Sequence, residues 1–483
     1  MSEAPLMVGV SGLRGISGKS LTADVAERYA GAFAAWLTAR GKARKVVVAR
    51  DGRAGGEEYV RAIVRAFTGA GFEVADLGVA MTPSVGVMVD HLSAPGAMMV
   101  TASHNPQQWN GLKCLVREPS GGAVAAAAPS SAMAEEIVGL FRSGRAPEPR
   151  PGGWVSGVGD AAPVHVSKVT AALAAVSAFN GSRPRRRRVV LDSVNASGVE
   201  GGRRLLAQSL GCELVHVGAE SSGVFPHAPE PTEENLSELA KSVARFSAEV
   251  GFAQDPDADR LAIIDEGGRY IGEEYTLALA AEAVLGAEER HQGQRGPERV
   301  LVTNLSTSRM LEDVAARHGA HVVRTPVGEA NVVEAMKREA AAGNEVVLGG
   351  EGNGGVIWPR VTYVRDSLSA MGLVLALMSR TGKTVSGLVA GMPSYAIEKR
   401  KVDLARREDA LPAVERIARA YAKERVDTQD GVRVDFETGA LAGRAWLHVR
   451  ASNTEPIMRL IAEAPTAEQA RGVLEEAGRV IAG

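Results

Sequence analysis

Residues 97–106 read AMMVTASHNP, a short apolar run followed at once by small and polar residues. Five other stretches have the same form: KVVVARDGR (45–53), RVVLDSVNASG (188–198), AEVGFAQDPDADR (248–260), RVLVTNLSTSR (299–309) and NEVVLGGEGNGG (344–355). Segments with helical spacing, such as residues 56–71 and 234–246, lie between them. Strands that alternate with helices predict an α/β fold with mainly parallel sheets, whose strands are buried on both faces.

The six strand-and-loop stretches fall into three successive pairs. In each pair the first loop is a plain polar turn, and the second is rich in chemically active side chains. This pattern predicts one α/β unit used three times, as a weak internal repeat. A Pro- and Gly-rich linker at residues 145–154 marks the end of the first unit.

The last part of the chain has a different pattern. A helix over residues 409–425 is followed by two alternating strands, and then by a closing helix with Thr466 as its N-cap. This order predicts a smaller α+β domain. We therefore expect four domains, over residues 1–153, 154–268, 269–390 and 391–483.

The overall composition excludes several classes of protein. Of 483 residues, 45% are hydrophobic and 23% are charged, which is ordinary for a soluble globular protein. The net charge of −2 gives no field that would attract nucleic acid or an anionic membrane. The one basic block, RPRRRR (183–188), precedes an apolar run, and we interpret it as a solvated strand entry.

Targeting and cysteine patterns point to the cytoplasm. The N-terminus lacks the basic start and long apolar stretch of a signal peptide. No apolar run is long enough to span a bilayer. Cys114 and Cys212 lie far apart and predict neither a disulfide framework nor a zinc site.

Ser103 follows an apolar strand after Thr101 and Ala102, at the place where α/β sheets bind their ligands. A hydroxyl on such a loop can be phosphorylated and presented to a ligand. Lys113, ten positions on, can supply charge or move a proton. The alternative is a plain turn made of Ser, His, Asn and Pro.

The DPDADR loop places Asp255, Asp257 and Asp259 at alternate positions. Alternate residues of an extended segment point the same way, so the three carboxylates should converge. They would repel one another unless a cation lay among them, and hard oxygen ligands suit Mg²⁺ completed by a phosphate oxygen. Arg260 adds a fixed positive charge. The alternative is a solvated acidic turn.

The GGEGNGG loop (349–355) also follows an apolar strand. Its glycines let the backbone approach a ligand closely. Glu351 and Asn353 carry groups that can bond sugar hydroxyls. A flexible turn without a ligand is the alternative.

The RASNTEP loop (450–456) has the composition of an anion site. Arg450 offers a planar fork that suits phosphate. Ser452, Asn453 and Thr454 bring further donors into a tight bend. The alternative is an Asx-type turn.

Taken in order, these serine, triple-aspartate, glycine-glutamate and arginine loops resemble those of the α-D-phosphohexomutase family, which includes phosphoglucosamine mutase, phosphomannomutase and phosphoglucomutase. The resemblance covers nearly the whole chain. Its most specific parts are the TASHNP motif, with a lysine ten positions after the serine, and the DPDADR motif. It implies three related α/β domains and a smaller fourth domain around a central cleft. It also implies a mutase that moves phosphate between the 6- and 1-positions of a hexose through a phosphoserine and a bisphosphate intermediate.

The resemblance implies a role for each matching residue, with Mg²⁺ as cofactor and a hexose 1,6-bisphosphate as activator. The residues that would act in catalysis are Ser103, which carries the phosphate, Lys113, which transfers a proton, and their neighbours His104, Arg14 and Arg260. The residues that would hold the metal are Ser103, Asp255, Asp257 and Asp259. The residues that would bind the sugar phosphate are Glu351, Asn353, Gly328, Arg450, Ser452, Asn453 and Thr454.

The chain departs from the family pattern in two loops. Many members end the sugar loop as Gly-Glu-x-Ser-Gly-His, whereas here Asn353 stands at the serine place and Gly355 at the histidine place. TPVGEAN (325–331) resembles the substrate loop of the third domain, but carries Glu329 where some mutases have His or Asp.

These departures favour phosphoglucosamine mutase, with phosphomannomutase/phosphoglucomutase as the alternative because SNTEP is also common there. A non-catalytic sugar-phosphate-binding relative is a third interpretation, and the presence of Ser103, Lys113 and all three aspartates argues against it. The expected partner is a small sugar phosphate, with neither nucleic acid nor membrane, and either a monomer or a dimer is compatible with the sequence.

Overall fold

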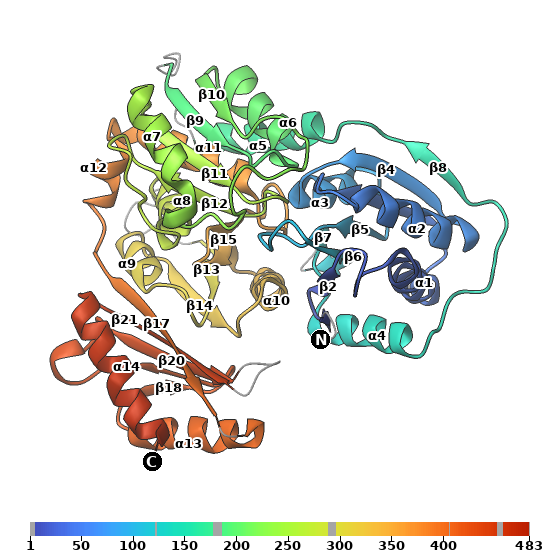
Figure 1. The fold of residues 1–483 in the computed structure, drawn as a ribbon. Helices are drawn as coiled ribbons and strands as arrows, with labels where there is room; N and C mark the ends of the chain where they lie inside the picture. The colour runs from blue at the N-terminus through green and yellow to red at the C-terminus, as the bar shows by residue number, and fades with distance from the viewer. Residues whose placement is uncertain are drawn as a thin grey trace.

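The residues that the structure describes fold into four β-sheets that follow one another along the chain, each with helices packed against it (Figure 1). In this computed structural model they are residues 5–120, 123–176, 186–287, 296–404, 406–451 and 457–482. Within these ranges no helix is both long enough and apolar enough to cross a membrane.

The first sheet has the strand order β1-β2-β6-β5-β3-β4-β8, with β7 paired to β6. Its strands are β1 (Leu6–Gly9), β2 (Gly12–Ile16), β3 (Lys45–Arg50), β4 (Glu73–Val79), β5 (Gly96–Val100), β6 (Trp109–Ser120), β7 (Ala123–Ala127) and β8 (Trp154–Gly157). Its helices are α1 (Ala23–Arg40), α2 (Gly56–Gly69), α3 (Thr82–His91) and α4 (Ser131–Arg142). Alternate strand residues face opposite sides, so Val46 and Val48 pack under α1, α2 and α4, whereas Val47 and Ala49 pack under α3.

The second and third sheets have the orders β10-β9-β11-β12 and β14-β13-β15-β16. The strands of the second are β9 (Arg188–Asp192), β10 (Glu213–Val217), β11 (Val250–Gln254) and β12 (Leu261–Ile264). The strands of the third are β13 (Arg299–Asn304), β14 (His321–Thr325), β15 (Glu345–Glu351) and β16 (Gly355–Ile357). In each sheet three parallel strands are followed by one antiparallel strand.

The order β4-β3-β5-β6 within the first sheet is the same arrangement, with the same strand directions. The internal repeat is therefore confirmed. All six predicted strands are present, and each predicted pair (β3 with β5, β9 with β11, β13 with β15) lies side by side and parallel. The second loops of the three units thus follow equivalent strands.

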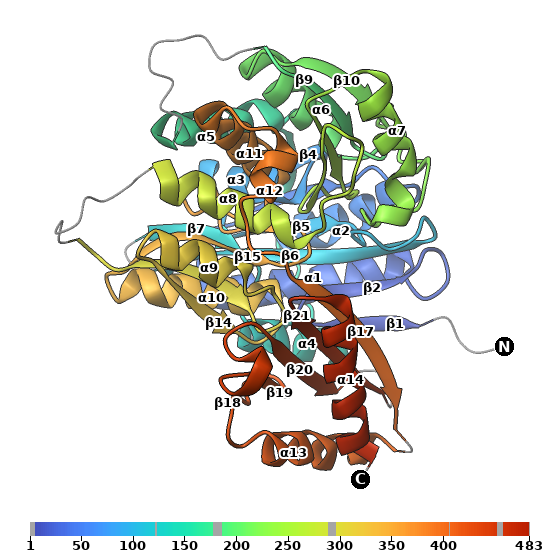
Figure 2. The same ribbon diagram turned by 90° about the vertical axis from the view of Figure 1, so that its left-hand side faces the viewer.

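Helices of the second and third units share one apolar core between their sheets. The helices of these units are α5 (Ala162–Val176), α6 (Gly198–Arg203), α7 (Ser237–Arg245), α8 (Glu274–Ala287), α9 (Met310–Arg317), α10 (Glu329–Ala341), α11 (Ser367–Thr381) and α12 (Val385–Val389). Figure 2 shows α5, α8 and α11 close together, and residues of all three belong to this core. Short 3₁₀ or π turns lie at Arg204–Ser209, Glu233–Leu236, Arg407–Asp409 and Gly439–Leu441.

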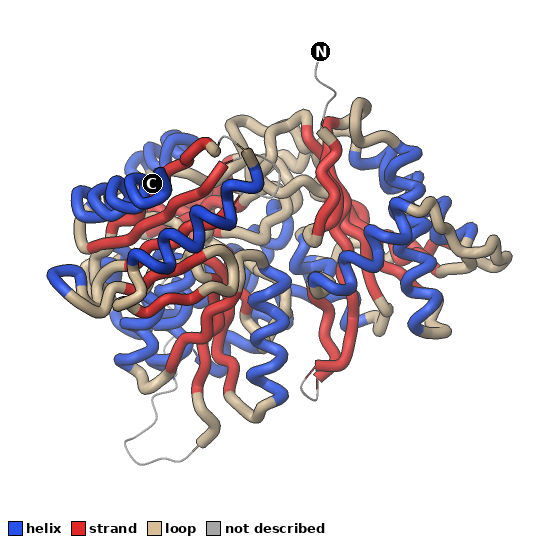
Figure 3. The backbone as a smooth tube through the Cα atoms, turned by 90° about the horizontal axis from the view of Figure 1, so that it is seen from below, coloured by secondary structure: helices blue, strands red, loops and turns tan. Residues whose placement is uncertain are grey.

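The fourth sheet is antiparallel throughout, in the order β17-β21-β20-β19-β18. Its elements are β17 (Ala396–Asp403), α13 (Ala410–Ala420), β18 (Arg425–Asp427), β19 (Val432–Asp435), β20 (Trp446–Ala451), β21 (Ile457–Ala464) and α14 (Ala467–Ala482). Figure 3 shows α14, which ends at the C label, lying along these strands. The hydroxyl of Thr466 accepts a hydrogen bond from the Gln469 amide at 3.2 Å, which confirms the predicted cap.

The predicted fold class is confirmed, as three related α/β units and a smaller α+β domain. β8 pairs with β4 as the edge strand of the first sheet. The predicted division at residues 153, 268 and 390 stays a prediction.

A fully buried polar chain joins the first three units. The Ser84 hydroxyl on α3 lies 2.9 Å from Nδ1 of His165 on α5, and Nε2 of His165 lies 3.1 Å from Oδ2 of Asp366. Asp366 caps α11 by accepting hydrogen bonds from the amides of Leu368 and Ser369. The backbone just before α11 is therefore fixed relative to both neighbouring units.

Two histidines form hydrogen bonds at the end of β9, and their pKa values shift in opposite directions. Nε2 of His227 lies 2.8 Å from Oδ2 of Asp192, and this hydrogen bond raises the pKa of His227. Nε2 of His216 lies 2.9 Å from the Ser193 hydroxyl, and burial lowers the pKa of His216 to about 4. The folded state therefore favours the protonated form of His227 and the neutral form of His216.

These shifts predict stability changes of opposite sign with pH. The contribution of His227 is fully present below its unfolded-state pKa of about 6.5 and is lost as pH rises through its higher folded-state pKa. For His216 the folded-state pKa is the lower one, so stability is lost as pH falls through the unfolded-state value toward the folded-state one. Thermal unfolding midpoints measure both effects. The amount by which His227→Gln lowers the unfolding midpoint relative to wild type should be larger at about pH 5.5 than at about pH 9. The amount by which His216→Gln lowers it should be smaller at about pH 5.5 than at about pH 9. Deficits that change in the same direction would contradict the assignment.

Candidate active site

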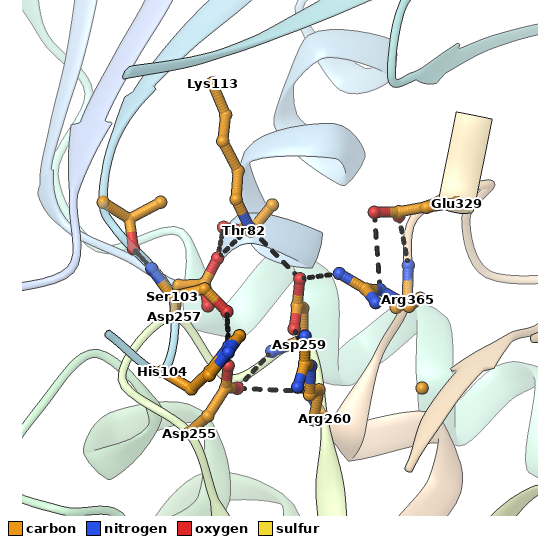
Figure 4. Close-up of polar contacts among 12 residues, drawn as sticks. Thr82, Ser103, His104, Lys113, Asp255, Asp257, Asp259, Arg260, Glu329 and Arg365 are labelled. Carbon is orange, nitrogen blue, oxygen red and sulfur yellow. Dashed lines mark hydrogen bonds and ion pairs between the residues drawn. The ribbon is translucent and has the colours of Figure 1, made fainter. Parts of the chain in front are cut away.

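The loops that follow β5, β11 and β15 meet in space, as expected for the carboxyl ends of equivalent strands. The Ser103 hydroxyl donates to Oδ2 of Asp255 at 2.8 Å. Arg365, just before α11, donates from Nη2 to Oδ2 of Asp259 and from Nη1 to Oε2 of Glu351, each at 2.7 Å. Figure 4 shows Ser103, the aspartates and Arg365 in one continuous polar cluster. The second loops of the three units, which are rich in chemically active side chains, thus form a single site.

Ser103 is presented by a turn with a rare backbone conformation. Its φ of 51° lies in the left-handed region, which is unfavourable for a residue with a Cβ. The Ser103 amide donates to the Thr101 hydroxyl at 2.9 Å, and the Ser103 hydroxyl lies 3.4 Å from Nδ1 of His104. Ser103 is only 1% exposed. Its hydroxyl therefore points inward, toward Asp255 on the second unit.

A buried ion pair holds this turn. Arg53 donates to the backbone carbonyls of Ser103 and of Trp109, the latter at 2.8 Å. Oδ2 of Asp51 accepts from Nε of Arg53 at 2.9 Å and from the Thr101 hydroxyl at 2.6 Å. The sequence pattern predicted only a plain polar turn for this Asp-Gly-Arg segment. The signal that could have revealed it was an aspartate and an arginine two positions apart at a strand end.

Asp255, Asp257 and Asp259 converge as predicted, with ligand oxygens that lie within 4.8 Å of one another. All three are fully buried. The predicted reason for the convergence is wrong, because the loop is a turn and not an extended segment. Ala258 has a φ of 54°, and Oδ1 of Asp255 accepts hydrogen bonds from the amides of Asp259 and Arg260.

Cationic side chains balance only part of this negative charge. Nζ of Lys113, on β6, lies 2.6 Å from Oδ2 of Asp257 and 3.2 Å from Oδ2 of Asp259. Burial alone would lower the pKa of Lys113, but these two carboxylates outweigh it and raise the pKa. Burial and the neighbouring carboxylates raise the pKa of Asp255 well above its ordinary value. The cluster is therefore electrostatically suited to a further cation.

The unpaired oxygens of the cluster test whether a divalent cation fits. Oδ1 of Asp257 and Oδ1 of Asp259 are buried, and neither accepts a hydrogen bond from any residue in the described ranges. Buried carboxylate oxygens without partners are costly. Oxygen-only ligands of this kind suit Mg²⁺. The donor set therefore fits the cation implied by the resemblance.

Three further predicted residues surround Ser103. Nη1 of Arg14 donates to Oδ1 of Asn105 at 3.0 Å, and Nε of Arg260 lies 3.8 Å from Oδ1 of Asp259. Burial, together with Arg260 and Arg14, lowers the pKa of His104 to about 3. His104 is therefore neutral near pH 7, and positive charge beside the serine comes from the arginines.

The glycine-rich loop (349–355) forms one hydrogen-bonded group with the 325–331 loop. Oε1 of Glu351 accepts from Nδ2 of Asn304 at 2.9 Å and from the Gly328 amide at 3.2 Å. Oε2 of Glu351 accepts from Nδ2 of Asn353 at 3.4 Å. The structure therefore brings the three residues that were predicted to contact the sugar to one place.

Arg450 approaches the same loop from the fourth domain. Its Nη1 lies 3.3 Å from Oδ2 of Asp430, and that oxygen accepts a hydrogen bond from the Val327 amide at 3.1 Å. The other residues predicted for the phosphate cradle lie outside the described residues: Ser452, Asn453 and Thr454.

Two residues that touch the aspartate loop (residues 255–260) were not predicted from the sequence. The Thr82 hydroxyl on α3 donates to Oδ2 of Asp257 at 2.7 Å. Arg365 contacts Asp259 from a segment that carries no recognisable motif. Both contacts link positions more than a hundred residues apart in sequence, so local patterns held no signal for them.

Comparison with known protein families gives a consistent result along the chain. Residues 5–136 match "Phosphoglucomutase/phosphomannomutase, alpha/beta/alpha domain I". Residues 164–268 match domain II of the same description and residues 273–395 match domain III. Residues 400–479 match its C-terminal domain.

Individual relatives are similar over nearly their whole length. A protein named phosphoglucomutase/phosphomannomutase from Thermococcus kodakarensis is 35% identical, over 97% of both chains. One named "Probable phosphoglucosamine mutase" from Methanopyrus kandleri is 31% identical, over 97% of this chain and 96% of its own. The crystal structure of a phosphoglucomutase/phosphomannomutase family protein from Burkholderia thailandensis is similar with a TM-score of 0.79 and 27% identity, over 98% of both chains.

Breaking the buried Asp51–Arg53 ion pair should strongly destabilise the folded protein. Arg53→Met should destabilise the protein by about 3–5 kcal/mol, because Asp51 would remain as a buried unpaired carboxylate. Adding Asp51→Asn should recover part of that loss. The fall in the thermal unfolding midpoint measures both changes.

A matched control is Arg65, which pairs with Glu27 at 2.7 Å on the surface. Arg65→Met should cost less than about 1 kcal/mol. Equal losses for the Arg53 and Arg65 variants would show that the buried pair does not hold the serine turn.

Proposed function

Because this chain belongs to the phosphoglucomutase/phosphomannomutase family of α-D-phosphohexomutases and is a phosphohexomutase, we propose that it acts through phosphorylation of Ser103. It would move phosphate between the 6- and 1-positions of a hexose, with a hexose 1,6-bisphosphate as intermediate and activator. The observation that carries this proposal is the 2.8 Å hydrogen bond between the Ser103 hydroxyl and Asp255, inside a buried carboxylate cluster.

The proposed cycle conserves phosphate. The phosphoryl group of Ser103 passes to the free hydroxyl of a hexose monophosphate, which leaves an unmodified serine and a bisphosphate. The bisphosphate turns over, and its other phosphoryl group returns to the Ser103 oxygen. We assign proton transfer to Lys113, the nearest amine to the aspartates, and the stabilisation of phosphoryl charge to Arg14 and Arg260, with His104 beside the serine.

We assign metal binding to Ser103, Asp255, Asp257 and Asp259. A bound Mg²⁺ would neutralise charge on the phosphoryl oxygens, which is most of what phosphoryl transfer requires of a protein. The two buried oxygens without hydrogen-bond partners support this assignment. Arg450, with Ser452, Asn453 and Thr454, would hold the phosphate that is not reacting.

We propose glucosamine phosphate as the preferred substrate. Glu351 and Glu329 both lie against the single guanidinium of Arg365, which leaves a surplus of negative charge beside the predicted sugar contacts. A protonated 2-amino group would complement this charge, and a neutral hydroxyl would not. A phosphomannomutase/phosphoglucomutase activity is the second candidate, because the 35% identical Thermococcus kodakarensis relative bears that name.

The first test concerns the phosphoserine. Intact-mass analysis should find one phosphoryl group on the wild-type protein and none on Ser103→Ala, with turnover reduced at least about a thousandfold because the nucleophile is gone. Ser167→Ala, at an exposed position on α5, is the matched control and should keep both the phosphate and the turnover. A wild-type protein with neither phosphate nor turnover would instead indicate a sugar-phosphate-binding relative.

The second test concerns the sugar. A coupled assay should compare the 6-phosphates of glucosamine, mannose and glucose, each with its own 1,6-bisphosphate. The kcat/KM for the glucosamine substrate should exceed the others by about tenfold or more, the effect of one charge interaction of about 1.4 kcal/mol. Glu329→Gln should reduce this preference. A higher kcat/KM with mannose or glucose phosphate would identify the alternative activity.

A further inference from the structure

Arg365 contacts three carboxylates of the candidate site, although no sequence motif predicted a role for it. Its guanidinium reaches Asp259 of the metal loop and Glu351 of the sugar loop at 2.7 Å each, and its Nε lies 3.4 Å from Glu329. Its own amide donates to Oε1 of Glu329 at 3.1 Å. One planar fork therefore holds carboxylates from three loops in a fixed relation.

The backbone that carries Arg365 is itself held on both sides. Asp366 caps α11 and lies 3.1 Å from His165 of the second unit. The Ser367 hydroxyl donates to the Ala258 carbonyl within the metal loop at 2.7 Å. The arginine is therefore placed by the packing of the units, and not by a flexible loop.

Gly355 makes room for this arginine. A Cβ at position 355 would lie 2.3 Å from Cδ of Arg365, which is closer than two carbon atoms can approach, and 3.1 Å from its Cγ, which is a tight contact. A free arginine could move aside, but here its far end is bound by three carboxylates. Any side chain at 355 would therefore have to displace the guanidinium from its partners.

We propose that Arg365 is a positioning residue that sets the metal ligand Asp259 and the sugar ligand Glu351 relative to each other, and that position 355 must be glycine to admit it. This inference rests on the proposed roles of Asp259 and Glu351. The Leu261 amide also donates to the Gly354 carbonyl at 3.0 Å, so the two loops are connected without Arg365. The contribution of Arg365 is therefore to orient the two carboxylates and to balance their charge.

Arg365 acts through charge and not through proton transfer. Burial would lower its pKa, but Asp259, Glu329, Glu351 and Asp255 outweigh burial and raise the pKa well above its ordinary value. The guanidinium stays protonated at every pH at which the protein is folded. Its loss would remove the guanidinium that joins Asp259 to Glu351. Each carboxylate would keep only its remaining hydrogen-bond partners, which are Lys113 for Asp259 and Asn304, Gly328 and Asn353 for Glu351.

Calorimetry with Mg²⁺ alone, together with steady-state kinetics, tests the proposal. Arg365→Ala should weaken Mg²⁺ binding by about 10- to 100-fold, the usual effect of removing the partner of a metal ligand, and should raise KM for the hexose phosphate. Arg365→Lys keeps the charge without the fork and should give intermediate values in both measurements. This variant preserves the test if the alanine variant does not fold.

Arg380→Ala is the matched control for losing a partly buried arginine. Arg380 donates to the Ala283 and Glu282 carbonyls, far along α11 from the site. Its loss should lower the unfolding midpoint without changing Mg²⁺ affinity or KM. Wild-type Mg²⁺ affinity and KM in Arg365→Ala would overturn the inference and reduce Arg365 to a structural role.

Asp257→Asn separates failure of this inference from failure of the proposed function. It should lose Mg²⁺ binding whether or not Arg365 has a positioning role. Normal Mg²⁺ binding in Asp257→Asn would overturn the metal assignment and this inference with it. Weakened binding in Asp257→Asn with normal binding in Arg365→Ala would overturn the inference alone.

A double-mutant cycle tests the part played by Gly355. Gly355→Ala alone should lower both Mg²⁺ affinity and kcat/KM, because the added methyl group displaces Arg365. In the Arg365→Ala background the same change should alter either value by less than about twofold, since the obstacle is gone. Losses that multiply in the double variant would show that glycine is required for another reason.

Discussion

The burial of three carboxylates in one loop is the constraint on which the rest of this structure depends. Charged groups taken out of water are tolerated only when opposite charges and hydrogen bonds surround them. Here the balancing side chains come from different units, with Lys113 on the first sheet and Arg365 in the third unit. The aspartate loop is therefore stable only when the units are packed together. Assembly of the domains and assembly of the site are the same physical event.

The repeated topology explains how three units can supply different chemistry at one point. In each unit the second parallel strand ends in the active loop, and the antiparallel strand that follows begins close by. In the first unit that returning strand, β6, carries Lys113 back to the aspartates. In the third unit the segment after β16 carries Arg365. The backbone plan is constant, and each unit differs in the side chains at the strand end and on the returning segment.

Local signals made the fold and much of the site predictable from the sequence. Apolar runs identified all six central strands, because buried parallel strands must be apolar on both faces. The loops that hold Ser103 and the three aspartates were recognisable because each loop begins where such a run ends. Arg365 was not recognisable, since Asp259 lies 106 residues away and arginine is common on any surface. Arg53 had a local signal in Asp51, two positions before it, but nothing local indicated its contact with the Ser103 carbonyl 50 residues away. The aspartate turn was also misjudged, because alternation in sequence does not reveal a positive φ at Ala258.

Formal charges in the cluster connect phosphorylation with metal binding. Among the described residues, four cationic side chains (Arg14, Lys113, Arg260 and Arg365) lie with five carboxylates (Asp255, Asp257, Asp259, Glu329 and Glu351), a net charge of −1. A phosphoryl group on Ser103 adds about two negative charges at neutral pH. A divalent cation restores the original balance. In a buried site, where uncompensated charge is costly, each of the two additions should therefore stabilise the other. The arginine beside Gly355 then acts on both, because it fixes a carboxylate that would bind the cation and one that would bind the sugar.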